Sequence, residues 1–136
     1  MHNVIPIITE AWDIIKTKLY RIIMEELARH VYKTLGSGYS ERVYHNATEV
    51  ILRKNGIAYE SERIVPIMFE GHIIGNLRAD LIVDGTVIEL KAVKSLNECM
   101  KIQATNYLKL TGHTKSLLIN FPQPQTDDIE IVNISL

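Results

Sequence analysis

Apolar residues in the first third of the chain recur every three or four positions, a spacing typical of amphipathic helices. Between residues 10 and 35 the recurring positions are Trp12, Ile15, Leu19, Ile22, Ile23, Leu27, Val31 and Leu35. This pattern predicts a helix over 10–35 that begins at a cap formed by Thr9 and is either continuous or broken near 17–19. The glycines of Gly36-Ser37-Gly38 are expected to end it, and a second helix is predicted over 39–55.

From residue 57 onward the pattern changes to short apolar segments rich in β-branched residues, which predicts strands. Strands are expected over 57–69, 72–83, 86–93, 115–121 and 129–135, and a third helix over 96–110. Pro66 indicates that the first strand lies at a sheet edge or carries an irregularity, and the last strand is expected at an edge.

The resulting order, α-α-β-β-β-α-β-β, predicts an α/β (α+β) fold with helices packed on a β-sheet. The β-α-β portion at 86–121 favours one parallel pair of strands, since such connections join parallel neighbours. With 136 residues and no repeat or long linker, the chain is expected to form a single domain over 1–136.

Composition narrows the class of protein. Hydrophobic residues make up 46% and charged residues 23%, which is ordinary for a globular protein. The net charge of −1 argues against a passive nucleic-acid coat, which is normally basic. It does not argue against a nuclease, because metal-binding carboxylates lower the net charge of such an enzyme.

The chain shows no sign of a membrane or secretory destination. No apolar run reaches the length of a membrane span, and residues 1–8 lack the features of a signal peptide. Cys99, the single cysteine, excludes an intramolecular disulfide and a cysteine-cluster zinc site, and we expect it to be a buried structural thiol. These observations predict an intracellular protein, in cytoplasm or nucleus, without a membrane partner.

The dipeptide Asp84-Gly85 is a strong signal for a two-residue hairpin turn, and such a turn sets the register of the strands beside it. Counting from the turn, Asp80 is expected opposite Glu89. By the same count, Arg78 faces Lys91. One face would then carry these four residues, and the other the core residues Ala79, Leu81, Val83, Ile88 and Leu90. Two facing carboxylates repel, and a cation between them or a raised pKa on one relieves the repulsion.

The hard oxygen ligands of such a pair suit Mg²⁺ or Mn²⁺. An ion there could activate water and neutralise phosphate charge, while Lys91 stabilises a hydroxide or a transition state. The structural alternative is a solvated strand face with alternating charges.

These residues also carry a family resemblance. Asp80 followed by Glu89-Leu90-Lys91 resembles the D…(D/E)xK signature of the PD-(D/E)xK nuclease superfamily, whose members have a restriction-endonuclease-like core. The segment from Gly38 to Tyr44 resembles the motif of the GxxExxY proteins, a small branch of that superfamily. Gln103 and Tyr107 resemble the QxxxY motif of RecB-like nucleases.

The similarity extends from about residue 19 to residue 121, and leaves 1–18 as an N-terminal extension of unknown role. Ala79 departs from the pattern, because it stands where the superfamily name has proline. The resemblance implies a mixed sheet flanked by helices, and a metal-dependent nuclease that cuts phosphodiester bonds, with DNA expected before RNA.

The resemblance also implies residue roles. The metal ligands would be Asp80, Glu89, the Leu90 backbone carbonyl and Glu41; the catalytic residues would be Lys91 with Asp80, Glu89, Gln103 and Tyr107; nucleic acid would be contacted by Arg78, Gln103 and Tyr107. From position alone, Glu41 could instead favour the start of a helix, and Gln103 and Tyr107 could be an ordinary helix pair. Arg78 either binds phosphate or pairs with an acid.

Two questions of function stay open at the level of sequence. One alternative to an enzyme is a catalytically silent nuclease-fold module that binds nucleic acid or a protein partner. The other concerns assembly: a homodimer is common among nucleases that cut both strands, and the N-terminal helix or the strand near 129–135 could supply its interface.

Overall fold

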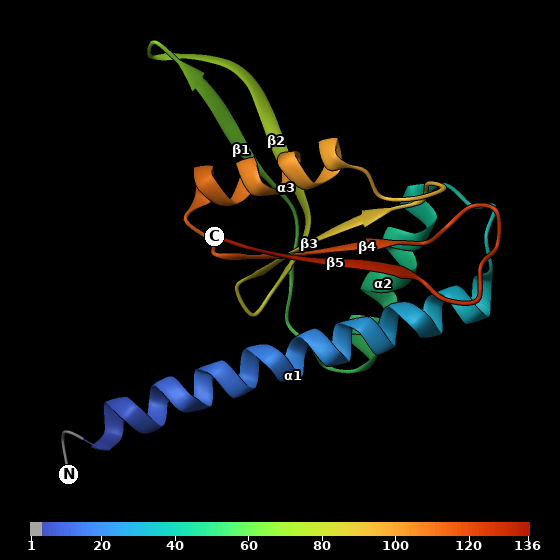
Figure 1. The fold of residues 1–136 in the computed structure, drawn as a ribbon, viewed down its shortest axis with the longest axis horizontal. Helices are drawn as coiled ribbons and strands as arrows, with labels where there is room; N and C mark the ends of the chain where they lie inside the picture. The colour runs from blue at the N-terminus through green and yellow to red at the C-terminus, as the bar shows by residue number, and fades with distance from the viewer. Residues whose placement is uncertain (1–3) are drawn as a thin grey trace.

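The computed structural model describes residues 4–136, with side chains described from residue 9 onward. Its helices are α1 (Val4–Leu35), α2 (Glu41–Lys54) and α3 (Glu98–Thr111). Its strands are β1 (Glu60–Phe69), β2 (His72–Val83), β3 (Thr86–Lys91), β4 (Lys115–Asn120) and β5 (Glu130–Ser135). The element order is the predicted one, and the helices flank a single five-stranded sheet (Figure 1).

The sheet is mixed, as predicted. Its spatial order is β1-β2-β3-β4-β5, and β3 and β4 form the one parallel pair through the α3 crossover. β1 and β5 are its two edges, and the β1–β2 register shifts between Ile67 and Met68, next to Pro66. The predictions for the edge strands are therefore confirmed. The β1–β2 hairpin extends well beyond the body of the molecule (Figure 1).

α1 differs from its prediction at the start. Within the described residues it begins at Val4 and continues without a break to Leu35. Thr9 therefore lies inside the helix rather than at its cap, and the break considered near 17–19 does not occur. No glycine or proline interrupts residues 7–35, so nothing in the backbone chemistry forces an end before Gly36, which adopts a φ of 72°.

Two apolar clusters cover the two faces of the sheet. The larger joins α1 and α2 to the sheet, and in it the ring of Tyr44 stacks on Phe121 at 4.5 Å between centroids. The smaller cluster packs Tyr107 and Leu108 of α3 on the other face. Cys99 belongs to neither, because it is exposed near the start of α3; the prediction of a buried thiol is wrong. No helix within 4–136 is long and apolar enough to cross a bilayer.

Candidate functional site

The β2–β3 hairpin keeps the predicted register only near its turn. Val83 pairs with Thr86, Ile82 with Val87, and Leu81 with Ile88, after which the ladder stops. The pairings expected for Asp80 with Glu89 and for Arg78 with Lys91 are absent from it. Instead the Leu90 backbone N–H donates to Asp80 Oδ2 at 2.7 Å. A side chain thus takes the place of a backbone acceptor where the two strands separate.

The expected division into one polar and one apolar face also fails at Asp80. Ala79 packs with Tyr107 in the smaller cluster, whereas Leu81 packs in the larger one. Residues two apart in a regular strand share a face, so the alternation of β2 shifts between them. The partner strand is irregular at the same level: Glu62 has a φ of 56° and is missing from the β1–β2 register between Ser61 and Arg63.

Asp80 and Glu89 nevertheless come together. Asp80 is only 5% exposed. Burial raises the pKa of Glu89 to about 8, with further contributions from the charge of Asp80 and a hydrogen bond to it; Lys91 acts in the opposite sense. The pair therefore holds a proton at neutral pH in the absence of another cation, because a largely desolvated carboxyl group resists ionising beside a second carboxylate.

Glu41 faces the same carboxylates from the start of α2. Ser40 is the N-cap residue, and its side chain makes no capping hydrogen bond. Burial raises the pKa of Glu41, the charge of Lys91 lowers it, and that of Asp80 raises it. Glu41 lines an open pocket together with Arg42, His45, Arg78 and Asp80.

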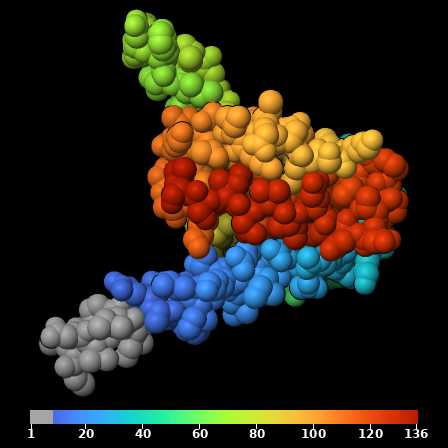
Figure 2. Space-filling view, viewed as in Figure 1, coloured from blue at the N-terminus to red at the C-terminus, as the bar shows by residue number. Residues whose placement is uncertain are grey.

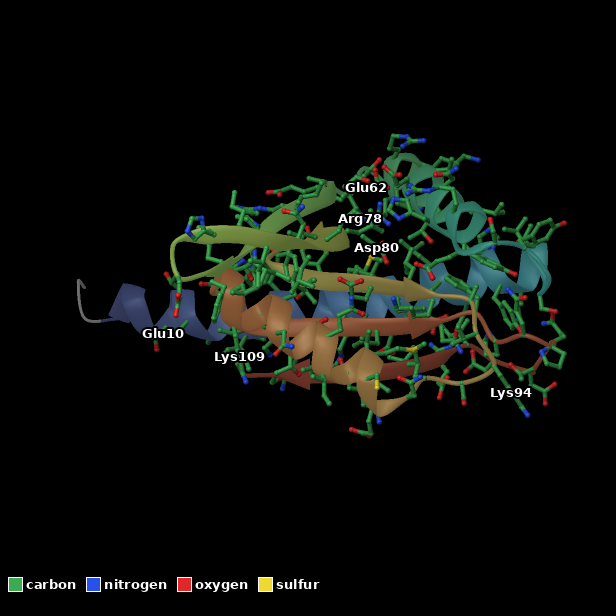
Figure 3. All side chains as sticks on the ribbon, turned by 90° about the horizontal axis from the view of Figure 1, so that it is seen from above. Glu10, Glu62, Arg78, Asp80, Lys94 and Lys109 are labelled. Atoms are coloured by element: carbon green, nitrogen blue, oxygen red, sulfur yellow. The ribbon has the colours of Figure 1, made fainter. Side chains whose placement is uncertain are left out.

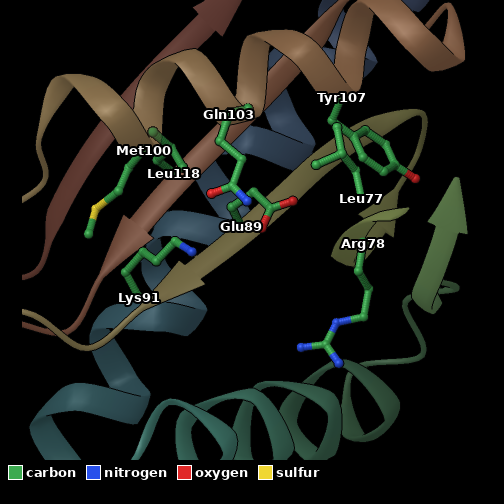
Figure 4. Close-up of a pocket in the computed structure, with 9 residues that line it drawn as sticks. Leu77, Arg78, Glu89, Lys91, Met100, Gln103, Tyr107 and Leu118 are labelled. Atoms are coloured by element: carbon green, nitrogen blue, oxygen red, sulfur yellow. The ribbon is translucent and has the colours of Figure 1, made fainter. Parts of the chain in front are cut away.

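Lys91 lies on the α3 side of the strand separation. A second pocket there is lined by Leu77, Arg78, Glu89, Lys91, Met100, Gln103, Ala104, Tyr107 and Leu118. In it, the Lys91 ammonium group and the Gln103 amide both point toward the Glu89 carboxylate (Figure 4). Arg78 lines both pockets, so the two openings meet around its side chain.

The remaining predicted residues have distinct settings. Gln103 is exposed, whereas Tyr107, one turn further along α3, is buried and its hydroxyl donates to the Arg63 carbonyl at 3.4 Å. Burial also raises the pKa of Tyr107. Arg78 lies 3.7 Å from the Glu62 carboxylate, beside Asp80 on the α2 side (Figure 3). Tyr107 and Arg78 thus each make a structural contact, and both also line the pocket that contains Glu89 and Lys91.

Sequence reasoning missed His45. It is 2% exposed; its Nε2 lies 3.0 Å from Glu49 Oε2 and its Nδ1 lies 3.9 Å from Asp80 Oδ1. The signal was available in the spacing, because Glu41, His45 and Glu49 are four residues apart and so share one face of α2. A search for the histidine spacings of zinc sites does not detect this pattern, because it contains only one histidine.

The donor chemistry suits a hard divalent ion. Lys91 C=O accepts from Phe121 N–H on the β4 side at 2.8 Å. Because successive carbonyls of a strand point in opposite directions, the Leu90 carbonyl points toward β2 and Asp80. Within residues 4–136 no group of three or more His, Cys, Asp and Glu side chains is arranged to enclose an ion. Mg²⁺ does not need one, since one or two carboxylates plus water and substrate phosphate commonly hold it.

Comparison with known families agrees with this geometry. A profile of the PD-(D/E)XK nuclease superfamily matches residues 17–132. The chain belongs to this superfamily. PD-(D/E)XK proteins are generally nucleases and typically use divalent metals.

A solved structure is similar in fold to this chain. This structure, "Crystal structure of SSO0001", is 26% identical in sequence and has a TM-score of 0.53. The similarity covers 69% of this chain and 48% of the other, so the chain spans about half the length of that relative. No curated protein has a significant match to the sequence.

Proposed function

We propose that this PD-(D/E)XK protein is a Mg²⁺- or Mn²⁺-dependent nuclease that hydrolyses phosphodiester bonds, with DNA as its substrate. The observation that carries the proposal is the meeting of Asp80, Glu89 and the Lys91 ammonium group where β2 and β3 separate, next to pockets that open to solvent. Buried carboxylates kept beside a lysine are costly to stability, which supports a chemical rather than a structural role.

Each residue has a stated part in this proposal. Asp80, Glu89 and the Leu90 carbonyl would hold the ion, and Glu41, which lies in the α2-side pocket with Asp80, would complete the acidic shell once the ion is bound. When bound, the ion supplies charge neutralisation at the scissile phosphate and activation of a water molecule. Lys91 stabilises the attacking hydroxide or the negative charge that develops on the phosphate.

Arg78, Gln103 and Tyr107 contact the nucleic acid. Arg78 joins the two pockets, so a backbone phosphate that lies across the site meets its guanidinium group. Gln103 and Tyr107 line the wall formed by α3, where they orient the lysine or a phosphate oxygen.

We also infer membership of the GxxExxY branch. Its three named residues have separable roles here. Gly38 has a φ of 104°, which favours glycine. Glu41 faces the carboxylates, and the Tyr44 hydroxyl donates to the Gly36 carbonyl at 2.6 Å, which fixes the loop before α2. The motif therefore positions Glu41 as well as supplying it.

A cleavage assay tests the nuclease proposal. Single- and double-stranded DNA and RNA are incubated with the protein in EDTA, Mg²⁺ or Mn²⁺, beside Lys91→Ala and Asp80→Ala. Metal-dependent cleavage is expected for the wild type and for Lys109→Ala, an exposed lysine of α3 outside both pockets, and is expected to be lost in the two site variants. Cleavage that survives Lys91→Ala contradicts the proposed role.

The same assay, combined with a binding measurement, distinguishes an active nuclease from a catalytically silent nuclease-fold module. A wild type that binds DNA or RNA tightly in an electrophoretic mobility assay, yet cleaves nothing with either metal, would favour a binding module. The net charge of −1 favours the form of this alternative that binds a protein partner, because it leaves little general attraction for nucleic acid.

A further inference from the structure

One carboxylate beside the open pocket of Glu41 and Asp80 contacts two arginines. The Glu62 carboxylate forms an ion pair with Arg42 of α2 and another, at 3.7 Å, with Arg78 of β2. Among the residues that the structure describes, every other carboxylate pairs with at most one arginine. Two guanidinium groups therefore converge on a single acid, so their positive charge exceeds the negative charge they meet in ion pairs.

An irregularity of β1 presents Glu62 to these arginines. Its φ of 56° is a left-handed conformation that is costly for residues other than glycine. Glu62 is also the residue that the β1–β2 register omits, between Ser61 and Arg63. It lies at the base of the β1–β2 hairpin, whose outer part stands clear of the body of the molecule (Figure 2). Backbone strain of this kind is typical of functional sites, which supports a functional role for the ion pairs.

The two arginines lie beside the carboxylates to which the ion is assigned. Both line the open pocket that also contains Glu41 and Asp80. Arg42 directly follows Glu41 at the start of α2, and Arg78 precedes Asp80 by two residues on β2. In Figure 3, Glu62, Arg78 and Asp80 lie in one group. A ligand held between the two arginines is therefore adjacent to the proposed ion site.

A phosphate of a nucleic-acid backbone has the chemistry that this pair of arginines fits. Guanidinium groups bind carboxylates and phosphates through the same forked hydrogen bonds, so a carboxylate between two arginines occupies the position of a phosphate. The side chains of Arg42, Arg78 and Glu62 are 49, 49 and 38% exposed. Exposed ion pairs contribute little to stability, so a phosphate can replace the Glu62 carboxylate without disturbing the core.

We propose that Arg42 and Arg78 form a binding site for one backbone phosphate of the nucleic acid, and that Glu62 occupies this site until the phosphate displaces it. The identity of the ligand rests on the proposed function, to which this inference adds Arg42 and Glu62. The two roles considered for Arg78 then follow one another: it pairs with an acid in the free protein and with a phosphate in the complex.

Fluorescence anisotropy with labelled DNA tests the exchange in the full chain. All variants carry Lys91→Ala so that the DNA stays intact, and binding is measured with Mn²⁺ present. Glu62→Gln is expected to bind about fivefold more tightly than its parent, because the two arginines are then free.

Glu60→Gln is the matched control for this gain. It removes the same charge from the same strand and frees Arg63, which lines neither pocket, so affinity should change by less than about twofold. Equal gains from Glu62→Gln and Glu60→Gln would overturn the proposal, because they would reflect only the loss of a negative charge.

Removal of both arginines completes the test. Arg42→Ala/Arg78→Ala is expected to weaken binding by about tenfold and to lower the slope of log affinity against log salt by about 1, the value for one phosphate contact. In this background Glu62→Gln should no longer strengthen binding, because it has no arginine to release. A fivefold gain that persists there overturns the exchange.

Each of these measurements reads binding rather than cleavage. A wild type that binds DNA and never cuts it refutes the nuclease proposal, while the gain from Glu62→Gln still supports the exchange. Metal-dependent cleavage by the wild type, with no gain from Glu62→Gln, refutes the exchange alone. Absence of DNA binding in the parent and in Glu62→Gln overturns the phosphate site.

Discussion

The two ends of the β2–β3 hairpin differ in how their strands are held together. The closed end, at the turn, is regularly paired, whereas the open end, from Asp80 and Glu89 onward, is not. Near the turn, Leu81 and Ile88 pair regularly and both are buried in the larger cluster. A single residue further from the turn, the ladder ends, Asp80 accepts the Leu90 N–H, and Glu89 carries a raised pKa. Regular backbone pairing holds the strands together near the turn, whereas beyond it a side chain replaces a backbone acceptor and two carboxylates interact.

This contrast explains how a small fold can hold costly charges. The apolar end anchors both strands, so the polar end need not contribute to stability. The separation also leaves room between β2 and β3 for two carboxylates that repel each other. A regular ladder disfavours such a pair. Variants at the two ends should therefore affect different properties.

The largest effect is expected from Leu81→Ala at the closed end. Leu81 is 0% exposed, so its truncation leaves a cavity and should lower the free energy of unfolding by about 3 kcal/mol. Urea denaturation followed by circular dichroism measures the loss. Ile74→Ala, on the exposed part of β2, serves as the control and should change stability by less than about 0.5 kcal/mol. An equal loss in both variants would show that the burial of Leu81 is not what stabilises the paired part of the hairpin.

Asp80→Asn at the open end should affect ion binding rather than stability. The amide oxygen can still accept the Leu90 N–H, but the charge is lost, and Mn²⁺ affinity should fall by about 100-fold, or ~2.7 kcal/mol. Titration calorimetry provides the measurement. Asp84→Asn makes the same change in the hairpin turn, where asparagine tolerates the positive φ, and should bind Mn²⁺ as the wild type does. Similar affinities for the two variants would remove Asp80 from the ion site.

Glu89→Gln should show how much the Glu89 carboxylate at the open end lowers the free energy of unfolding, and this effect should depend on pH. The folded-state pKa of Glu89, about 8, lies above the ordinary glutamate value of 4.5, so the folded protein holds an extra proton between these values. Wild-type stability should then fall as pH rises from 4.5 through 8, because in this range the unfolded state has released its proton while the native state still holds one.

Without metal, Glu89→Gln is expected to be more stable than the wild type by about 1–2 kcal/mol at pH 8.5 and to show little gain at pH 5. Thermal unfolding in EDTA at both pH values tests this, with the exposed Glu98→Gln as control. A gain of equal size at both pH values would show that the carboxylate is not the cause.

The smallest effect is expected from Gln103→Ala in the α3 wall. Its side chain is exposed, so stability and Mn²⁺ affinity should stay unchanged while cleavage slows by roughly threefold to tenfold, or ~1 kcal/mol. Ile102→Ala, its exposed neighbour outside the pocket, should cleave normally. Loss of Mn²⁺ affinity in Gln103→Ala would instead place this residue in the ion shell.

The sequence predicted the elements and their order well, because these depend on local patterns. Periodicity separated helices from strands, Asp84-Gly85 fixed the register as far as Leu81 and Ile88, and Pro66 marked an edge strand. The motif residues Asp80, Glu89 and Lys91 could be chosen before any geometry was known, since their spacing is that of a family whose profile matches the chain.

The tertiary structure decided where those rules stop. Counting along the hairpin could not show that β2 changes face at Asp80, because it sees neither the irregularity of the neighbouring strand at Glu62 nor the side chain that replaces a ladder bond. The exposure of Cys99 and the contact of His45 with Asp80 likewise depend on which elements pack together. Local propensity acts between near neighbours in sequence, whereas burial and charge depend on neighbours in space that only the folded chain supplies.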